Sequence, residues 1–189
     1  MGISLSWVAL TDGSPNQLRD SLGFELTDQS EEYPESPFVE ATLPSKIHLI
    51  ILNKGEVSEK QLVEASNASE IIHGMVDDHC MVSSLACWKN GEECWYVAHD
   101  EPKGGILDLQ VRGDLPSVFD DIKEEQFKAQ EDEGGAGSEV DYIFDIPVYL
   151  GDKLVGFRSD ADVEYEVDNP YKVLRKKKGS GLFGLFKKG

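Results

Sequence analysis

Short apolar runs separated by polar turns predict four strands in the first 76 residues. A buried strand is a short run of apolar side chains, and a half-buried strand alternates apolar and polar positions. Pro34 and Pro37 disfavour a strand in the polar stretch 28–37, which is therefore expected to be a loop. The four predicted strands cover residues 4–10, 39–43, 47–52 and 70–76.

Two helices are predicted between these strands. Ser14-Pro15 supplies an N-cap and a favoured first helical residue, and Gly23 ends that helix. Ser58 followed by Gln61 matches a capping box and opens a helix to about residue 68. The resulting order is β-α-β-β-α-β. It predicts an α+β fold that contains a ferredoxin-like half.

An antiparallel meander is predicted to extend this half. Two apolar segments, 81–89 and 92–99, flank Asn90-Gly91, which is a strong signal for a two-residue hairpin turn. Residues 106–111 are expected to form a third strand after the turn at 102–105.

The C-terminal half is predicted to be mainly helical. Spaced apolar residues predict a helix over 115–133, and Asp145 and Gly156 mark the ends of another. Residues 160–168 alternate acidic and mostly apolar side chains, which predicts a half-buried strand with one acidic face.

The charge is distributed unevenly between the body and the C-terminus. The chain carries 18 basic and 36 acidic residues, a formal charge of −18. Seven of the bases and none of the acids lie in 171–189, so the remaining 11 bases face 36 acids, a formal −25. We therefore expect one domain over residues 1–171 and a flexible, disordered basic tail over 172–189. The acidic body disfavours nucleic acid as a partner, although solubility alone also explains its charge.

The basic tail contains four large apolar residues between two lysine clusters. Such a segment either seats weakly on an anionic membrane surface or folds back onto the acidic body. A solvated terminus without a binding role is the third alternative. The tail residues with a candidate contact role are Lys176, Lys177, Lys178, Phe183 and Phe186.

The three cysteines and two tryptophans of the predicted hairpin have competing interpretations. With a two-residue turn, Cys87 is expected opposite Cys94, within reach of a disulfide. A redox pair, or a zinc site that adds His79 and Cys80, is one interpretation. The six-residue gaps between the cysteines argue against zinc, and cysteine is a common buried core residue, so buried thiols are favoured. Trp88 and Trp95 are expected together on the other face, packed against a helix or exposed for recognition. Scarce cysteine favours the reducing cytoplasm.

One acid–base constellation is a candidate for catalysis. His99 and Asp100, followed by Asp108, lie at a strand end, but adjacent strand residues point to opposite faces. The chain contains no nucleophile elbow and no phosphate-binding glycine loop. The sequence therefore predicts no cofactor and no metal, and a small hydrolase using these three residues is the alternative function.

Three segments resemble a set of uncharacterised bacterial proteins. They are Leu5-Ser6-Trp7-Val8-Ala9-Leu10, Glu35-Ser36-Pro37 and 141–147, which reads Asp-Tyr-Ile-Phe-Asp-Ile-Pro. The resemblance spans most of residues 1–160. It implies a bacterial cytoplasmic protein and transfers no catalytic residue.

The function expected from these observations is a non-catalytic protein-interaction module of a regulatory, immunity-like or accessory kind. It would bind a protein partner through an acidic surface, with the oligomeric state left open. The acids expected to form that surface are Asp160, Asp162, Glu164 and Glu166.

Overall fold

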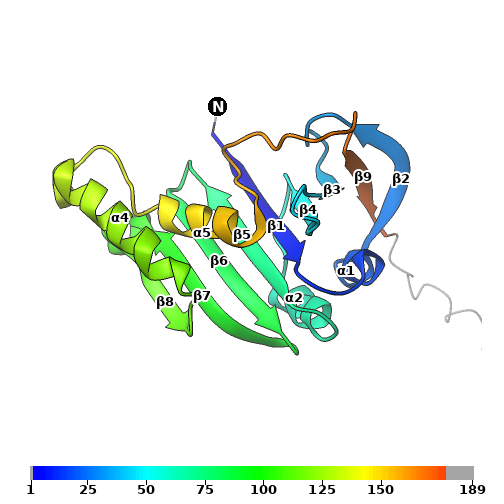
Figure 1. Ribbon diagram of the computed structural model, residues 1–189, viewed down its shortest axis with the longest axis horizontal. Coiled ribbons are helices and arrows are strands. Elements are labelled where there is room, and N and C mark those ends of the chain that lie inside the picture. Colours follow the sequence, from blue (N-terminus) through cyan, green and yellow to red (C-terminus); the bar gives the residue numbers. More distant parts are fainter. Residues whose placement is uncertain (1, 178–189) are drawn as a thin grey trace, which may run out of the picture.

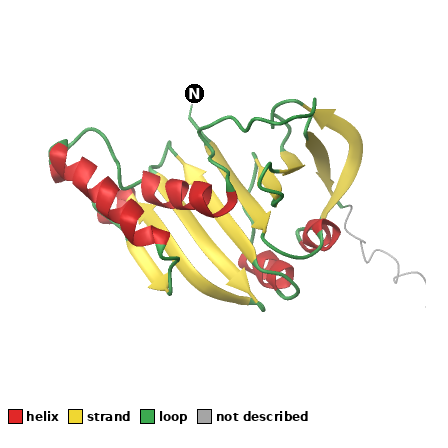
Figure 2. Ribbon diagram, in the orientation of Figure 1, coloured by secondary structure: helices red, strands yellow, loops and turns green. Residues whose placement is uncertain are grey.

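The computed structural model describes residues 2–177 and contains one nine-stranded antiparallel sheet with helices on both faces, an α+β fold (Figures 1 and 2). The strand order is β2-β9-β3-β4-β1-β5-β6-β7-β8. The strands are β1 (Ser4–Leu10), β2 (Phe24–Glu31), β3 (Phe38–Thr42), β4 (His48–Leu52), β5 (Ile71–Asp77), β6 (Val82–Lys89), β7 (Glu92–Asp100), β8 (Gln110–Gly113) and β9 (Tyr171–Lys176). The helices are α1 (Pro15–Ser21), α2 (Glu59–Ser66), α3 (Glu101–Gly104), α4 (Val118–Asp132) and α5 (Asp145–Val155), with a short 3₁₀ turn at Gly135–Gly137.

Alternation along the central strands divides the core into two layers. In β1, Val8 and Leu10 face α1 and α2, whereas Trp7 and Ala9 face the opposite side. Leu18 of α1 is buried in the same layer as Val8. The capping box predicted at α2 is present, since the Ser58 side chain and the Gln61 backbone are hydrogen-bonded and the reciprocal bond is also made.

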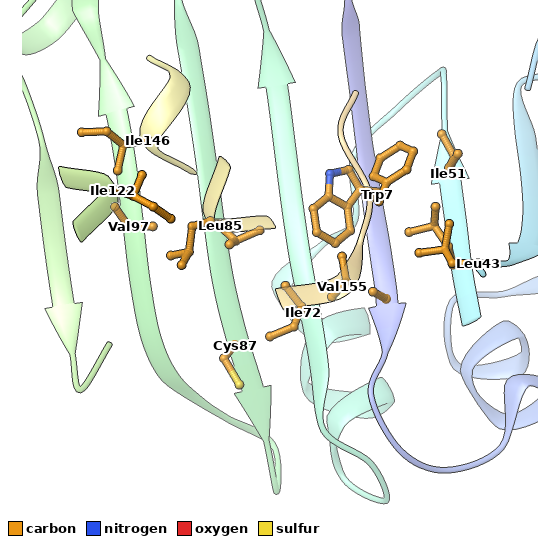
Figure 3. Packing of buried hydrophobic residues seen from close by; sticks show 14 of the residues in the cluster. Trp7, Leu43, Ile51, Ile72, Leu85, Cys87, Val97, Ile122, Ile146 and Val155 are labelled. Atoms are coloured by element: carbon orange, nitrogen blue, oxygen red, sulfur yellow. The ribbon is translucent and has the colours of Figure 1, made fainter. Parts of the chain in front are cut away.

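The second layer lies beneath α5, which crosses β5, β6 and β7, and beneath α4, which packs beside α5 on the β7–β8 side of the same face (Figure 1). Figure 3 shows how Trp7, Ile72 and Leu85 of the sheet gather with Val155 of α5 and Ile122 of α4. Both helices were predicted, and the half-buried Phe127 packs against this layer. The same layer includes Phe157, so it anchors the beginning of the segment that follows α5.

The predicted loop over 28–37 is wrong at its beginning. Residues up to Glu31 belong to β2, an edge strand that pairs with β9. Its polar side chains are compatible with an edge, where only one neighbour is needed and one face meets water. Pro34 and Pro37 lie outside the strand, as their missing amide hydrogens require.

The predicted boundary between body and tail at residue 172 is also wrong. Residues 172–176 belong to β9, which lies inside the sheet between β2 and β3. Val173 and Leu174 are buried, whereas Lys172, Arg175 and Lys176 are exposed. The basic composition of this segment led to the prediction of a tail. A strand can nevertheless form there, because only its apolar residues need to enter the core. The predicted disorder of 178–189 lies outside the described residues.

The hairpin prediction is correct at its turn and wrong in its register. Asn90 and Gly91 both have positive φ, as a two-residue hairpin turn of this kind requires. A register shift next to Trp88 places Cys87 opposite Trp95 and leaves Cys94 out of the pairing. Trp88 therefore packs in the α1–α2 layer and Trp95 in the α4–α5 layer, not together on one face as predicted.

The third strand of the meander begins later than predicted. A short helix, α3, follows β7, and β8 covers only Gln110–Gly113 instead of 106–111. Among residues 2–177, no helix combines the length and apolar character needed to span a bilayer.

Candidate functional site

The segment 157–168 connects α5 to β9 across the sheet, and we call it the strap. It begins where Gly156 ends α5 in a left-handed conformation, with φ of 79°. Phe157 is buried, and its ring meets the edge of Trp7 with 5.5 Å between ring centroids. The Ser45 hydroxyl donates a hydrogen bond of 2.8 Å to the Val155 carbonyl, so the start of the strap is fixed on both sides.

The strand predicted over 160–168 is wrong, because these residues make no ladder with a neighbouring strand. The predicted alternation nevertheless describes how the strap lies. Val163 and Tyr165 are half-buried against the α4–α5 layer, and the Tyr165 ring meets Tyr171 edge-on at 5.4 Å. The acids between and beside them, Asp160, Asp162, Glu164, Glu166 and Asp168, are exposed.

A cavity of about 300 Å³ opens beside the first half of the strap. Its apolar lining comes from the sheet and from the strap, and its polar lining includes three carboxylates. Tyr33, from the β2–β3 connection, also lines it and is 55% exposed. The apolar lining includes Ile3, Leu5, Ile51, Phe157 and Val163, and the acids are Glu32, Asp160 and Asp162.

A second cavity of about 560 Å³ opens beside the second half of the strap. Leu43 and Pro44, from the β3–β4 turn, line one side with Lys46, and residues 164–167 line the other. Val167 is 64% exposed there. The strap therefore forms a wall of two cavities, each combining apolar surface with exposed carboxylates.

One cation balances part of the strap. The Arg158 guanidinium donates to both carboxylate oxygens of Asp160, at 2.9 and 2.5 Å, and lies 4.9 Å from the centre of the Tyr149 ring. The hydrogen bond from Arg158 holds the pKa of Asp160 below its ordinary value. Burial, followed by the charge of Asp160, raises the pKa of Asp145 to about 6. Asp162, Glu164 and Glu166 make no ion pair with any described residue.

His99 occupies a different environment from the one a catalytic base needs. It is fully buried on β7, where Nδ1 donates to the Asp108 carbonyl at 2.8 Å and Nε2 lies 2.8 Å from Asp141 Oδ2. Burial lowers the pKa of His99, but the hydrogen bonds to Asp141 and Asp108 outweigh it and raise the pKa overall. This pair connects β7 to the segment before α5.

The predicted convergence of His99 with the carboxylates of Asp100 and Asp108 is not found. The Asp108 carboxylate accepts from the Asp100 amide at 3.1 Å, and the Asp100 carboxylate accepts from Lys103 at 2.5 Å. His99 instead pairs with the carboxylate of Asp141, and the sequence did not indicate that these two residues would meet.

The cysteines are free thiols, with Cys80 and Cys94 exposed and Cys87 buried. Burial raises the pKa of the Cys87 thiol to about 12, which opposes a redox role at neutral pH. Among residues 2–177, no three metal-ligating side chains are grouped in a way that could hold a metal ion.

The sequence also gave no sign of a buried charge network under α1. Glu40 of β3 accepts two hydrogen bonds of 2.7 Å from the Arg19 guanidinium, and His48 Nε2 lies 3.4 Å from Glu40 Oε2. Only alternation could have found Glu40, since it falls on the buried face between Val39 and Ala41 of the other layer.

Two of the five candidate tail residues lie in the described chain, and both contact the body. The Lys176 ammonium lies 5.3 Å from the Phe38 ring centre. Lys177 donates its amide to the Gly23 carbonyl and its ammonium to Asp20, each at 2.8 Å. Lys178, Phe183 and Phe186 lie outside the described residues.

Comparison with known proteins gives no relative from which to transfer a function: no family model, no curated protein and no solved structure matches this chain.

Proposed function

We propose that this protein is a non-catalytic interaction module that binds a basic polypeptide segment along the strap. The observation that carries the proposal is the position of Asp162, Glu164 and Glu166, which are exposed, unpaired with described residues and adjacent to two partly apolar cavities. A partner with lysine or arginine next to large apolar side chains matches both features.

Attraction and affinity come from different side chains of this surface. Exposed carboxylates steer a cationic partner and select against an anionic one. Apolar side chains that fill cavities supply most of the binding free energy. The strap offers both within one segment, and Tyr33 and Val167 provide exposed apolar surface beside it.

The alternative of a small hydrolase receives no support from this geometry. His99 is fully buried, and it lines neither of the two strap cavities. The alternative of weak membrane contact through the tail loses two cations, because Lys176 and Lys177 are occupied by contacts with the body.

Two finer statements belong to the same proposal. We infer that β1, α1, β3, β4, α2 and β5 form a ferredoxin-like half to which β2 and β9 are added. The order β5-β1-β4-β3 and the shared face of α1 and α2 support this. The free thiols are consistent with a cytoplasmic protein.

A peptide library displayed on phage and selected on the immobilised full chain tests the proposal. We expect enrichment of peptides that combine basic and large apolar residues. These peptides should be released by raised salt, which screens exposed charges. Enrichment of acidic or uncharged peptides would contradict the proposed partner chemistry.

Two triple variants locate the binding surface. The strap variant carries Asp162→Asn, Glu164→Gln and Glu166→Gln. The matched control, with the same loss of charge, carries Glu124→Gln, Glu131→Gln and Glu133→Gln at exposed positions in and just after α4. Selected peptides should bind the control as tightly as the natural chain and the strap variant about ten-fold more weakly. Equal binding to both variants would place the site elsewhere.

A further inference from the structure

We infer that the occupant of the strap cavities is the C-terminal segment 178–189 of the same molecule, an inference that rests on the proposed function. The segment reads Lys-Gly-Ser-Gly-Leu-Phe-Gly-Leu-Phe-Lys-Lys-Gly. It therefore has the composition that the strap selects: three lysines, no acid and four large apolar side chains.

Charge complementarity is the first argument. Among the described strap acids, only Asp160 has an ion-pair partner, Arg158. Asp162, Glu164 and Glu166 remain to attract cations. Lys187 and Lys188 directly follow the apolar residues of the segment. A segment with apolar side chains in the cavities therefore brings two ammonium groups to the strap carboxylates.

The apolar surface is the second argument. Each cavity has an apolar side: Ile3, Leu5, Ile51 and Phe157 in one, and Leu43, Pro44 and Val167 in the other. Phe183 and Phe186 are three residues apart, about 10 Å in an extended chain. Two large rings are therefore available, one for each cavity.

The length of the chain is the third argument. Tyr171, at one end of β9, lines the first cavity, and Lys177 lies just beyond the other end, held to Asp20 of α1. The six residues of β9 span about 20 Å. Residues 182–186 are five to nine positions beyond Lys177, a reach of about 16–30 Å. The segment is therefore long enough to run back along the length of β9, toward the end at which Tyr171 lines the first cavity.

Tethering makes the same-molecule contact effective even when the contact itself is weak. A short flexible connection gives an effective concentration of about 1 mM. A segment with a dissociation constant near 0.1 mM would then occupy the cavities about ten times as often as it leaves them free. An external basic partner must displace the segment, so the contact is autoinhibitory.

A labelled synthetic peptide of residues 178–189 tests this in the full chain, with binding followed by fluorescence anisotropy. The tail variant carries Leu182→Ser, Phe183→Ser, Leu185→Ser and Phe186→Ser. We expect it to bind the peptide about ten-fold more tightly than the natural chain, because its cavities are free. Adding the three strap substitutions to the tail variant should weaken this binding about ten-fold. Adding the three α4 control substitutions should leave it unchanged.

Four results would overturn the inference. Equal peptide affinity of the natural chain and the tail variant would mean that the segment does not occupy its own cavities. If neither protein bound this peptide while both bound library-selected peptides, the inference would fail and the proposed function would stand. If neither bound any basic peptide, both would fail. Concentration-dependent dimers of the natural chain that the tail variant does not form would assign the contact to a second copy.

Discussion

The buried charged residues of this protein are ion-paired, whereas most of the acids of its strap are exposed and unpaired with described residues. His99 with Asp141, and Arg19 with Glu40, lie in the two core layers and are paired at 2.7–2.8 Å. Asp162, Glu164 and Glu166 are exposed and have no ion-pair partner among the described residues. Buried charges need partners because losing water is costly, whereas exposed charges do not. Unlike the buried charges, the strap acids are therefore free to meet another polypeptide.

The largest expected effect comes from breaking the His99–Asp141 pair. His99→Ala leaves the Asp141 carboxylate buried without its partner, so we expect the free energy of unfolding to fall by about 3–5 kcal/mol. Urea denaturation measures this. Asp100→Asn, which disturbs only an ion pair with the exposed Lys103, is the control and should cost less than about 1 kcal/mol.

The pH dependence of this effect has a defined sign. The folded-state pKa of His99 is raised, so its contribution is complete below the ordinary histidine pKa of about 6.5 and is lost as the pH rises through the folded value. The difference between the natural chain and His99→Ala should therefore narrow in alkaline solution. A difference that widens with pH would show that His99 is buried in its neutral form.

A smaller loss is expected when the network under α1 is broken. Arg19→Ala removes both hydrogen bonds to Glu40, and we expect a loss of about 2–3 kcal/mol because Arg19 is partly exposed and water can replace some of its contacts. Arg19→Lys keeps the positive charge but cannot make both hydrogen bonds in the same geometry, so its free energy of unfolding should lie between those of the natural chain and Arg19→Ala. Denaturation midpoints that do not distinguish Arg19→Ala from the natural chain would contradict this account.

Asp145→Asn is expected to stabilise the protein. Because the folded-state pKa of Asp145 is raised to about 6, its ionisation at neutral pH opposes folding. The variant should gain about 1–2 kcal/mol at pH 7.5, less than the full shift because the side chain is half-buried. The gain should disappear below pH 3.8, where Asp145 is protonated in both states. A loss of stability at pH 7.5 would mean that its carboxylate is needed in the native state.

The smallest expected effect on stability belongs to the strap variant. Its three acids are exposed and unpaired with described residues, so their neutralisation should change the free energy of unfolding by less than about 0.5 kcal/mol. Thermal unfolding at neutral pH checks this. A fall in the free energy of unfolding above about 2 kcal/mol would show that these carboxylates stabilise the fold. The contrast between the strap acids and the buried charge pairs would then be wrong.

The sequence predicted local structure more successfully than pairing. The helices α2, α4 and α5 and the Asn90-Gly91 turn follow from caps, periodicity and turn residues close in the chain. The unpaired Cys94 and the strand β9 depend on distant partners, and neither has a local signal. The alternation in 160–168 predicted which side chains face the core, but it could not tell a hydrogen-bonded strand from an extended strap.

The same distinction applies to the candidate site. The acids of the strap were found because they recur at every second position. The two cavities could not be predicted, because much of their apolar lining comes from β1, β4 and the β3–β4 turn, which are distant from the strap in sequence. The partner of His99 could not be found either, because Asp141 is 42 residues further along the chain and meets it only in the fold.

Calorimetric titration of a library-selected basic peptide into the natural chain, the strap variant and the α4 control tests the central claim most directly. The account predicts about a ten-fold weaker affinity for the strap variant, because three lost charge contacts of about 0.5 kcal/mol each correspond to that factor. The control should stay within about two-fold of the natural chain. Equal weakening in both variants would show that overall charge, and not the strap, attracts the partner.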